Sequence, residues 1–269
     1  MAAFFERPRT YFYRTPVPRM YAGFTPRPFL LLDPLRRAVI VNTMMRISVI
    51  IPTLNEEARI EGLLRSLQVI PGLEIIVVDG MSQDRTVEIV KALTPRVWAA
   101  PRGRALQMNE GARHATGEGL LFLHADTRLT PSALDQLTSA LSDPTIIGGA
   151  FSFGLDSQQW GLRLIEAVTN LRARLFLLPY GDQAIFVRRG VFEEIGGYAE
   201  LPLLEDLELI RRLKRQGRVV ILPAKAITSA RRWRAEGILY TTLRNWVVTI
   251  LFYLGVSATT LARWYSPVR

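Results

Sequence analysis

Short apolar runs recur between residues 46 and 126 of the chain. The runs ISVIIP (47–52), LEIIVVD (73–79) and GLLFLHAD (119–126) show almost no alternation of polar and apolar residues. This pattern is typical of parallel strands that are covered on both faces. We therefore predict three buried strands in this region.

The segments between and after these runs have a helical spacing of apolar residues and favour helices over 55–68, 82–93 and 103–117. In the first segment, the apolar residues from Ile60 to Leu67 share one face, and the two glutamates of NEE are expected in its first turn, where the helix dipole favours anions. The alternation of strands and helices predicts an α/β fold, with a mostly parallel sheet and helices on both faces.

Two aspartates end predicted strands. Asp79 follows the second run and Asp126 follows the third, and ligands of such sheets bind at the carboxyl ends of the strands. We expect both carboxylates to face one crevice, where they accept hydrogen bonds from a ligand or hold a cation. Asp84 is expected instead to cap the helix that begins beside it.

The composition excludes several classes of site. The chain has 269 residues, 49% apolar and 22% charged, which is ordinary for a globular protein. It has no cysteine, which excludes disulfides, thiolate zinc sites and cysteine nucleophiles. The net charge of +10 is compatible with nucleic acid, anionic lipid or a phosphate-bearing substrate as partner.

Residues 1–45 differ from the rest of the chain. They contain seven arginines against Glu6 and Asp33, together with six prolines, and they show no sustained period. We predict an irregular basic extension over residues 1–45, and a domain that begins near Arg46.

Neither a P-loop sequence nor a G-x-G-x-x-G turn follows the first strand, which argues against the common nucleotide folds that use them. Five other motifs occur in order: ISVIIPTLNEE, EIIVVDGMSQDRT, LLFLHADTRL, LLEDLELIRRLKRQG and SARRW. Together they resemble family 2 glycosyltransferases with the GT-A fold, over residues 46 to about 237. FLHADT, SARRW and FYLGVS are similar to a bacterial subgroup labelled for arsenosugar biosynthesis, and similar relatives are labelled carotenoid-acid glycosyltransferases.

The resemblance implies a site for a nucleotide diphosphate sugar donor. Pro52, Thr53, Asn55 and Glu56 match the P-x-x-N-E turn that lies against the nucleoside, and Asp79 matches the aspartate that recognises the base. The family often has a second aspartate where this chain has Gly80, so the specificity for the base stays open.

The resemblance also implies a divalent metal. Asp126 matches the last aspartate of the D-x-D motif that holds the metal on the diphosphate, whereas His124 stands where that motif has its first aspartate. Mg²⁺ prefers oxygen ligands and Mn²⁺ accepts imidazole. We therefore expect either Mn²⁺ or Mg²⁺, with His124 as a ligand or as a positioning residue.

Asp206 matches the catalytic base of the family, and Glu205 lies beside it. A second interpretation is that both residues belong to the acidic first turn of a helix over 204–216. The two interpretations are compatible, because a residue at the start of a helix can also point into a cleft and act as a base. Arg232 matches the arginine of the Q-x-x-R-W motif and is expected at the diphosphate, with Arg104 as a further phosphate contact.

The predicted acceptor residues are Trp233, from the same motif, and Asp182, which precedes an apolar strand. Ser229 stands where the motif has glutamine, so the acceptor contact that the glutamine makes in the family stays open for this chain. The acceptor is a hydroxyl of a small molecule or a lipid that the sequence does not identify.

The segment 238–269 is predicted as a separate helical unit. Between Arg244 and Arg263 lie 18 residues without a charge, at the lower limit for a membrane span. Gly255 interrupts this run, so we favour a helix at the membrane interface over a spanning helix. The aromatic residues expected at the headgroups are Trp246, Tyr253, Trp264 and Tyr265, and the arginines expected near anionic lipid are Arg244, Arg263 and Arg269. The alternative is a buried helix that closes the domain.

These observations predict an inverting, metal-dependent transfer of a sugar to a hydroxyl, by a cytoplasmic protein with peripheral contact to the inner face of the membrane. Two alternatives remain: a nucleotide-sugar-binding protein of the same fold without activity, and a basic nucleic-acid-binding protein. The strand-end carboxylates argue against nucleic acid as the partner, because they repel phosphates.

Overall fold

The computed structural model describes residues 45–264. Residues 1–44 of the predicted extension over 1–45 lie outside the described residues, as do Tyr265 and Arg269.

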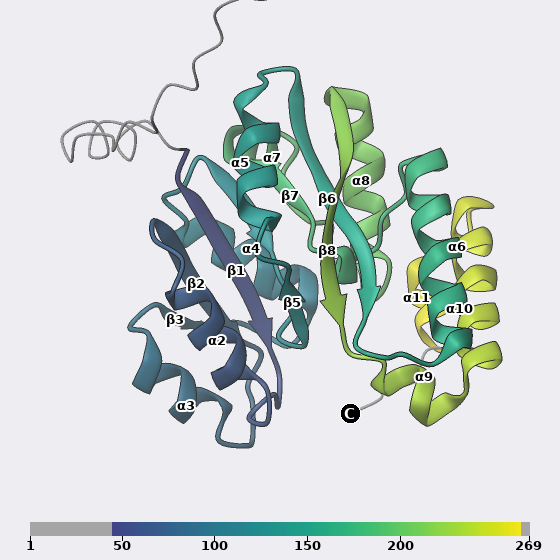
Figure 1. Ribbon diagram of the computed structural model, residues 1–269, viewed down its shortest axis with the longest axis horizontal. Helices are drawn as coiled ribbons and strands as arrows, with labels where there is room; N and C mark the ends of the chain where they lie inside the picture. The colour runs from purple at the N-terminus through teal and green to yellow at the C-terminus, as the bar shows by residue number, and fades with distance from the viewer. Residues whose placement is uncertain (1–44, 265–269) are drawn as a thin grey trace, which may run out of the picture. The chain divides into compact units, whose positions relative to one another are not determined.

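A curved sheet forms the centre of the described part of the chain (Figure 1). Its strands are β1 (Ile47–Thr53), β2 (Leu73–Asp79), β3 (Val97–Ala99), β4 (Gly119–Phe122), β5 (Thr127–Leu129), β6 (Ile146–Leu155), β7 (Phe186–Arg188) and β8 (Arg218–Thr228). They are arranged in the order β3-β2-β1-β4-β7-β6-β8-β5. The three predicted strands are β1, β2 and β4, and they lie side by side.

The sheet is mostly parallel, as predicted. β1 pairs in parallel with both β2 and β4, β2 with β3, and β6 with β8. β7 runs antiparallel between β4 and β6, and β5 runs antiparallel to β8. The carboxyl ends of β1, β2, β4, β6 and β8 therefore point toward the same edge, where a ligand is expected.

Helices cover both faces of the sheet. On one face, α2 (Ile60–Gln68), α3 (Thr86–Leu93) and α5 (Ala133–Ser142) bury their apolar residues against Val49, Ile51 and other residues of the strands. The opposite face is covered by α4 (Arg104–His114), α7 (Arg189–Glu194) and α8 (Glu205–Gln216). Ile50, between Val49 and Ile51, points to this second face, as the pleat of a strand requires. The predicted α/β fold is confirmed.

Several predicted boundaries were wrong. The helix expected over 55–68 begins at Ile60, so the two glutamates of NEE lie in a turn ahead of it instead of in its first turn. The helix expected from residue 82 begins at Thr86. The third strand ends at Phe122, and the residues up to Asp126 form a turn beyond it.

A group of helices packs at the far end of the sheet. It comprises α6 (Trp160–Phe176), which follows β6 in the chain, and α9 (Arg231–Glu236), α10 (Ile238–Tyr253) and α11 (Ala258–Ala262), which follow β8. The short helix η1 (Gly181–Gln183) comes between α6 and β7. Figure 1 shows α6, α10 and α11 together beside β6 and β8. Gly255 has φ of 94° and separates α10 from α11, as the sequence indicated. Within residues 45–264, none of the helices is long and apolar enough to cross a membrane.

Candidate active site

A cavity of about 510 Å³ lies at the carboxyl edge of the strands. Its walls come from the end of β1, the turn after β4, η1, the start of α8, and the segment from the end of β8 to α10. Most of the predicted site residues line it: Pro52, Thr53, Glu56, Arg104, His124, Asp126, Asp182, Asp206, Arg232 and Trp233. The structure therefore brings together residues that are up to 181 positions apart, from Pro52 to Trp233.

Gln107 of α4 supports the β1 side of the cavity. Its Nε2 donates hydrogen bonds to the carbonyl oxygens of Thr53 and Val78, at 2.8 and 2.9 Å. Because these carbonyls lie at the ends of β1 and β2, one amide group ties the two strand ends together. Gln107 is buried and lines the cavity. Its helical position gave no signal in the sequence that distinguished it from a core residue.

Asn55, Glu205 and Asp79 are not part of the cavity lining of the described residues. The Oδ2 and Oδ1 atoms of Asp79 accept hydrogen bonds from the amide and the hydroxyl of Ser82, at 2.8 and 2.5 Å. The Oδ1 of Asn55 accepts from the amide of Gln83 at 2.8 Å. In this structure the turn after β2 binds the Asp79 carboxylate, and a shared crevice for Asp79 and Asp126 stays a prediction.

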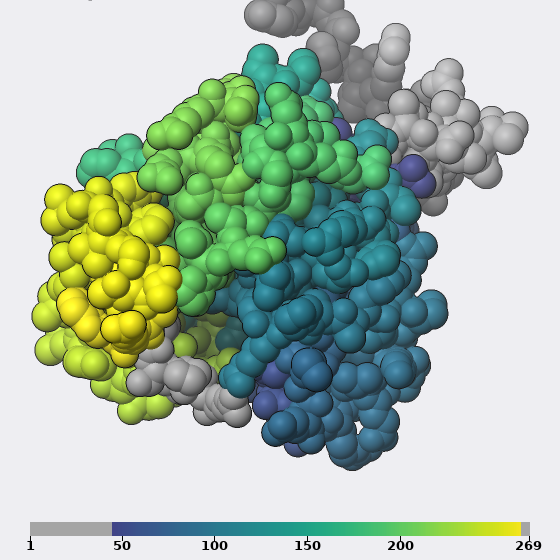
Figure 2. Space-filling model, turned by 180° about the vertical axis from the view of Figure 1, so that it is seen from behind, coloured from purple at the N-terminus to yellow at the C-terminus, as the bar shows by residue number. Residues whose placement is uncertain are grey.

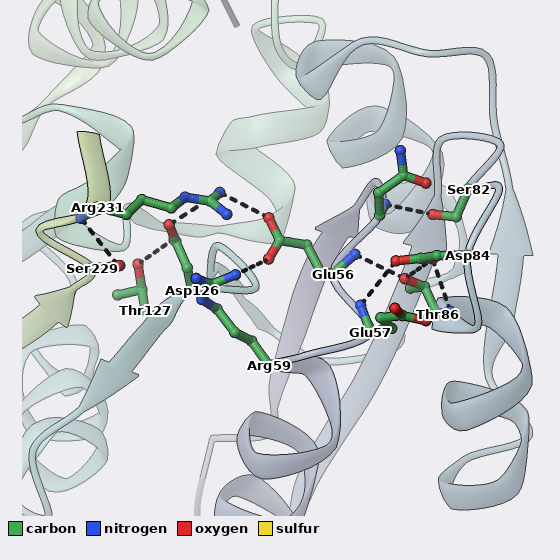
Figure 3. A network of polar contacts seen from close by, with 11 residues as sticks. Glu56, Glu57, Arg59, Ser82, Asp84, Thr86, Asp126, Thr127, Ser229 and Arg231 are labelled. Atoms are coloured by element: carbon green, nitrogen blue, oxygen red, sulfur yellow. Dashed lines mark hydrogen bonds and ion pairs between the residues drawn. The ribbon is translucent and has the colours of Figure 1, made fainter. Parts of the chain in front are cut away.

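Asp84 has a structural role, as expected. Its Oδ1 accepts hydrogen bonds from the amide and the hydroxyl of Thr86, the first residue of α3, at 3.0 and 2.5 Å. Its Oδ2 accepts a third from the amide of Glu57 at 3.2 Å. Burial, the largest single influence, raises the pKa of the Asp84 carboxyl, but the hydrogen bonds together outweigh it, so the net pKa is lowered. The carboxylate joins the turn before α2 to the start of α3 (Figure 3).

Arg231 bridges two sides of the cavity. Its Nη2 lies 2.9 Å from Oε1 of Glu56 and 3.6 Å from Oδ2 of Asp126, and Figure 3 shows the guanidinium between the two carboxylates. The sequence analysis missed this residue, because its neighbour Arg232 matches the family motif. Arg231 and Arg232 both line the cavity, so two adjacent cations are available for an anionic ligand.

Asp206 stands at the N-terminus of α8 and faces His124 across Gly181. The amide of Gly181 donates to Oδ2 of Asp206 at 2.5 Å. A Cβ atom at Gly181 would lie 3.2 Å from Nε2 of His124 and 3.3 Å from Oδ2 of Asp206. A side chain at position 181 would therefore have to push the imidazole or the carboxylate aside by a few tenths of an ångström. Burial, followed by the positive charge of Arg104, lowers the pKa of His124 to about 4, so the imidazole is neutral at pH 7.

Glu205 forms an ion pair with Arg104. Its side chain is 3% exposed, and its Oε1 lies 2.7 Å from Nε of Arg104. Burial raises the pKa of the Glu205 carboxyl, and Arg104 opposes that shift. Arg104 itself lines the cavity, so Glu205 holds in place a cation that faces the ligand.

The wall opposite β1 is formed by η1 and α10. Asp182, Asn245, Val248 and Thr249 all line it. Tyr180 joins the two elements, because its hydroxyl lies 2.7 Å from the hydroxyl of Thr249. Burial, followed by the nearby charge of Asp206, raises the pKa of Asp182 to about 7. The segment predicted as a separate helical unit thus contributes to the cavity.

The chain matches a known family over the part that carries these motifs. A family model described as "Glycosyl transferase family 2" matches residues 48–196, which is more than half of the chain. The chain belongs to glycosyltransferase family 2. This finding confirms the family that the sequence motifs indicated. The resemblance to an arsenosugar subgroup stays a prediction.

Two named relatives illustrate the range of this similarity. The "PGL/p-HBAD biosynthesis glycosyltransferase Rv2957" of Mycobacterium tuberculosis is 32% identical over 164 residues, 56% of this chain and 62% of that protein. The "Undecaprenyl-phosphate 4-deoxy-4-formamido-L-arabinose transferase" of Pseudomonas aeruginosa is 28% identical over 163 residues, 55% of this chain and 48% of that protein. The match therefore spans less than two thirds of the length of these relatives.

Solved structures share the fold. Residues 1–349 of Staphylococcus aureus TarS in complex with UDP-GlcNAc match with a TM-score of 0.55 at 19% identity, over 69% of this chain and 58% of that chain. Glucosyl-3-phosphoglycerate synthase of Mycobacterium tuberculosis, in complex with Mn²⁺, UDP and glucosyl-3-phosphoglycerate, matches with a TM-score of 0.50 at 19% identity, over 71% and 72%. At these identities the likeness supports the GT-A fold of the family 2 chain.

The side chains of the cavity offer ligand atoms for a divalent metal, provided that the substrate supplies further ligands. Asp126 offers a carboxylate and His124 a neutral imidazole, and both line the cavity. The residues that the structure describes contain no group of three or more histidine, aspartate, glutamate or cysteine side chains suited to a metal. A metal would therefore need phosphate oxygens to complete its coordination, which is a common arrangement in phosphate-binding sites.

Trp233 lies at the border between the cavity and the core. Its indole Nε1 donates to the hydroxyl of Thr242 at 3.3 Å, and its ring centroid is 6.1 Å from that of Phe153. Because α10 holds the indole, a face of Trp233 is fixed at the cavity wall.

Proposed function

We propose that this family 2 protein transfers a sugar from a nucleotide diphosphate sugar to an acceptor hydroxyl, with inversion at the anomeric carbon. The observation that carries the proposal is the arrangement of charges in one cavity. Arg231 lies between Glu56, in the turn after β1, and Asp126, whereas the Asp206 carboxylate accepts a hydrogen bond from Gly181 of η1. A donor diphosphate needs positive charge near its phosphates, and an acceptor hydroxyl needs a carboxylate that can take its proton.

Asp206 is the proposed base. The acceptor oxygen attacks the anomeric carbon while the bond from that carbon to the diphosphate oxygen breaks. The electron pair of the broken bond leaves with the diphosphate, and the acceptor proton passes to Asp206. One attack from the side opposite the leaving group inverts the configuration. Amide donors from Gly181 and Leu207 hold the carboxylate at 2.5 and 2.7 Å, which supports a base of defined orientation.

The leaving diphosphate accumulates negative charge, and Arg231 and Arg232 are the proposed side chains that stabilise it. Arg231 is held by Glu56 and Asp126 in the present arrangement, so its charge is already directed toward the donor side. Arg104, positioned by Glu205, is a third candidate contact. Pro52, Thr53 and Glu56 are proposed to lie against the nucleoside, with Asp79 and Asn55 supporting their turn.

A divalent metal is part of the proposal. Asp126 and His124 would hold it together with the diphosphate, and Mn²⁺ suits this mixture of oxygen and nitrogen better than Mg²⁺. When bound, the metal supplies positive charge to the diphosphate. The Mn²⁺ and UDP named for the glucosyl-3-phosphoglycerate synthase structure support this choice.

A second candidate function is binding of the nucleotide sugar without transfer. It is favoured by one observation, that His124 stands at the first position of the metal motif. The two functions differ in one measurable property, the metal-dependent release of nucleoside diphosphate from the donor.

A donor panel tests the proposal. Thermal unfolding is measured with UDP-, GDP- and dTDP-sugars, each with Mn²⁺ and with EDTA. We expect one nucleotide to raise the melting temperature only with the metal, and its sugar to be transferred or hydrolysed. Failure of every donor to bind would contradict the proposed function, whereas binding without release would favour the second candidate.

We further propose a peripheral position at the inner face of the membrane, through the outward faces of α6 and α10. These helices expose many large apolar side chains: Trp160, Leu164, Leu171, Leu175, Phe176, Leu239, Tyr240, Leu243, Trp246, Val247, Ile250 and Tyr253. Leu239 and Trp160 are 85% and 81% exposed. Exposed apolar surfaces of this kind mark interaction sites, and Figure 2 shows the yellow C-terminal helices along one outer edge.

Charge favours an anionic bilayer as the occupant of this surface. Residues 237–264 contain no acidic residue. Lys214 lies at its border, with its Nζ 2.9 Å from the carbonyl oxygen of Phe176, and Arg174 is exposed nearby in α6. Arg244, expected near lipid, was misplaced by the sequence analysis, because its side chain is 9% exposed and pairs with Glu236 at 2.6 Å.

Vesicle flotation tests the membrane proposal. We expect the protein to float with vesicles that contain phosphatidylglycerol and to stay in solution with pure phosphatidylcholine. The double variant Leu171→Glu, Leu243→Glu should lose flotation. Val69→Glu is the matched control, because Val69 is equally apolar and exposed but follows α2 at the other end of the sheet. The wild type could instead fail to float and form a dimer that the double variant does not form. That result would assign the surface to contact with a second copy of the chain.

A further inference from the structure

The wall of the cavity opposite β1 carries polar atoms without partners. The Oδ1 atoms of Asp182 and Asn245 are shielded from solvent, and neither accepts a hydrogen bond from any described residue. Both residues line the cavity. A buried polar atom without a partner costs free energy, and such atoms mark places where a ligand supplies the missing partner.

The surroundings of this pair are rigid. Tyr180, next to η1, bonds to Thr249 of α10 at 2.7 Å, and the guanidinium of Arg172 from α6 stacks on the Tyr180 ring at 3.8 Å. The hydroxyl of Thr249 in turn donates to the carbonyl oxygen of Asn245 at 2.8 Å. These contacts join α6, the residue before η1, and α10, the elements that carry or adjoin Asp182 and Asn245.

The oxygen atoms of this wall favour a ligand group that donates hydrogen bonds, such as a hydroxyl. Asp182, Asn245 and the nearby Asp206 all present oxygen atoms, which an anionic group such as a phosphate would meet with repulsion. An alcohol instead donates to these oxygens. Burial raises the pKa of Asp182 to about 7, so its carboxyl also donates to an alcohol oxygen when protonated. The amide of Asn245 both donates and accepts in either orientation of its plane.

We propose that the acceptor is a neutral polyol, one hydroxyl of which is held by Asn245 and Asp182 while a second hydroxyl faces Asp206. This inference rests on the proposed sugar transfer and adds the class of acceptor. Asn245 is a specificity-determining residue in α10, outside the segment in which the family motifs occur. The polyol is a free sugar or the sugar headgroup of a lipid, because both present the same hydroxyl groups.

Direct binding tests the inference without the need for catalysis. Saturation-transfer NMR is recorded with three probes, each with and without UDP and Mg²⁺: methyl glucoside, a glucosyl diacylglycerol in vesicles, and farnesyl phosphate. We expect at least one glucoside to bind and farnesyl phosphate not to displace it. A response limited to the vesicle arm would identify the lipid headgroup as the source of the polyol.

Variants assign the contact to the wall. Asn245→Ala should weaken glucoside binding about tenfold, since it removes a buried hydrogen-bond partner of a hydroxyl. Asn245→Asp keeps an oxygen in the same place and should recover most of the affinity. Asp182→Ala should also weaken binding, and Thr259→Ala, exposed on α11, should leave it unchanged. Melting curves of each variant check folding.

Three results would overturn the inference: no binding of either glucoside, unchanged affinity in both Asn245→Ala and Asp182→Ala, or displacement of the glucoside by farnesyl phosphate. A protein that binds a glucoside in an Asn245-dependent manner but binds no nucleotide sugar would instead contradict the proposed function alone.

Discussion

Replacement of Asp182 by asparagine should change how the stability of the protein depends on pH. The carboxyl has a pKa of about 7 in the folded protein against 3.8 as the ordinary value, chiefly because it is buried. A raised pKa means that the folded state binds the proton more tightly than the unfolded state. The protonated Asp182 carboxyl therefore makes its full contribution to the free energy of unfolding below about pH 4, and this contribution is lost as the pH rises through 7.

The magnitude follows from the size of the shift. A change of about 3 pH units at about 1.4 kcal/mol per unit corresponds to a loss of about 4 kcal/mol between pH 4 and pH 8. Asparagine has no proton to lose, so the variant escapes this loss. We expect the free energy of unfolding of the variant, relative to wild type, to rise by about 4 kcal/mol over that range. Any packing effect of the substitution is the same at every pH and cancels.

His124 has the opposite influence. Its pKa is lowered from 6.5 to about 4, so its contribution is present above 6.5 and is lost as the pH falls toward 4. In wild type the effects of Asp182 and His124 oppose each other between pH 4 and 6.5. In Asp182→Asn the opposing effect of the Asp182 carboxyl is gone, and the effect of His124 remains. The free energy of unfolding of the variant should therefore rise with pH between pH 4 and 6.5.

Urea unfolding followed by circular dichroism, in EDTA at half-unit steps from pH 4 to 8, measures these slopes. Asp143→Asn is a useful control, because hydrogen bonds from Thr145 lower the pKa of that carboxyl below its usual value. Asp143 therefore titrates below the measured range, and the difference between this variant and wild type should stay nearly constant from pH 4 to 8. A difference between Asp182→Asn and wild type that stays constant within about 1 kcal/mol would refute the reasoning.

Four further outcomes are expected. Asp126→Ala should lose the metal dependence of donor binding in calorimetry, and unchanged Mn²⁺ dependence would contradict its role. His124→Asp should shift the metal preference from Mn²⁺ toward Mg²⁺ in activity titrations, whereas an unaltered profile would limit His124 to positioning. Asp206→Asn should reduce turnover about 10²–10⁴-fold with donor affinity nearly unchanged, and Glu205→Gln should reduce it less; the reverse order would move the base to Glu205. Deletion of residues 1–43 should preserve folding and transfer, and an insoluble product would show that the extension supports the domain.

The strands and the helix faces were predictable, because they depend on local patterns. The apolar runs of β1 and β4 are buried throughout, and β2 is buried from Ile76 to Asp79. Ile60, Leu63, Leu64 and Leu67 form the buried face of α2 as expected. The start of α2 was not predictable. The amides of Glu56 and Glu57 bond to Thr86 and Asp84, which lie in another segment, so a tertiary contact replaces the first helical turn.

The candidate site was only partly predictable, for a similar reason. Motif matching selects positions one at a time, and it selected Arg232, whereas the contact between Arg231, Glu56 and Asp126 depends on the approach of α9 to the end of β1. Asp79 stands at the expected strand end. The tight turn to Ser82 binds its carboxylate, and the strand pattern alone does not indicate that local contact.

The sequence of α10 carries two signals at once, and its apolar character concealed the polar one. Leu243, Trp246 and Ile250 are exposed on one side of the helix, whereas Asn245 and Thr249 face the cavity. These polar residues are four positions apart, which places them on one face of a helix. In the sequence they are recognisable only as two polar residues within a mostly apolar segment. If the exposed side rests on a bilayer, the cavity wall with Asn245 is one helix thickness from the lipid. A headgroup sugar would then reach Asp206 while its lipid stays in the membrane, so the membrane proposal and the polyol proposal support each other although they are tested separately.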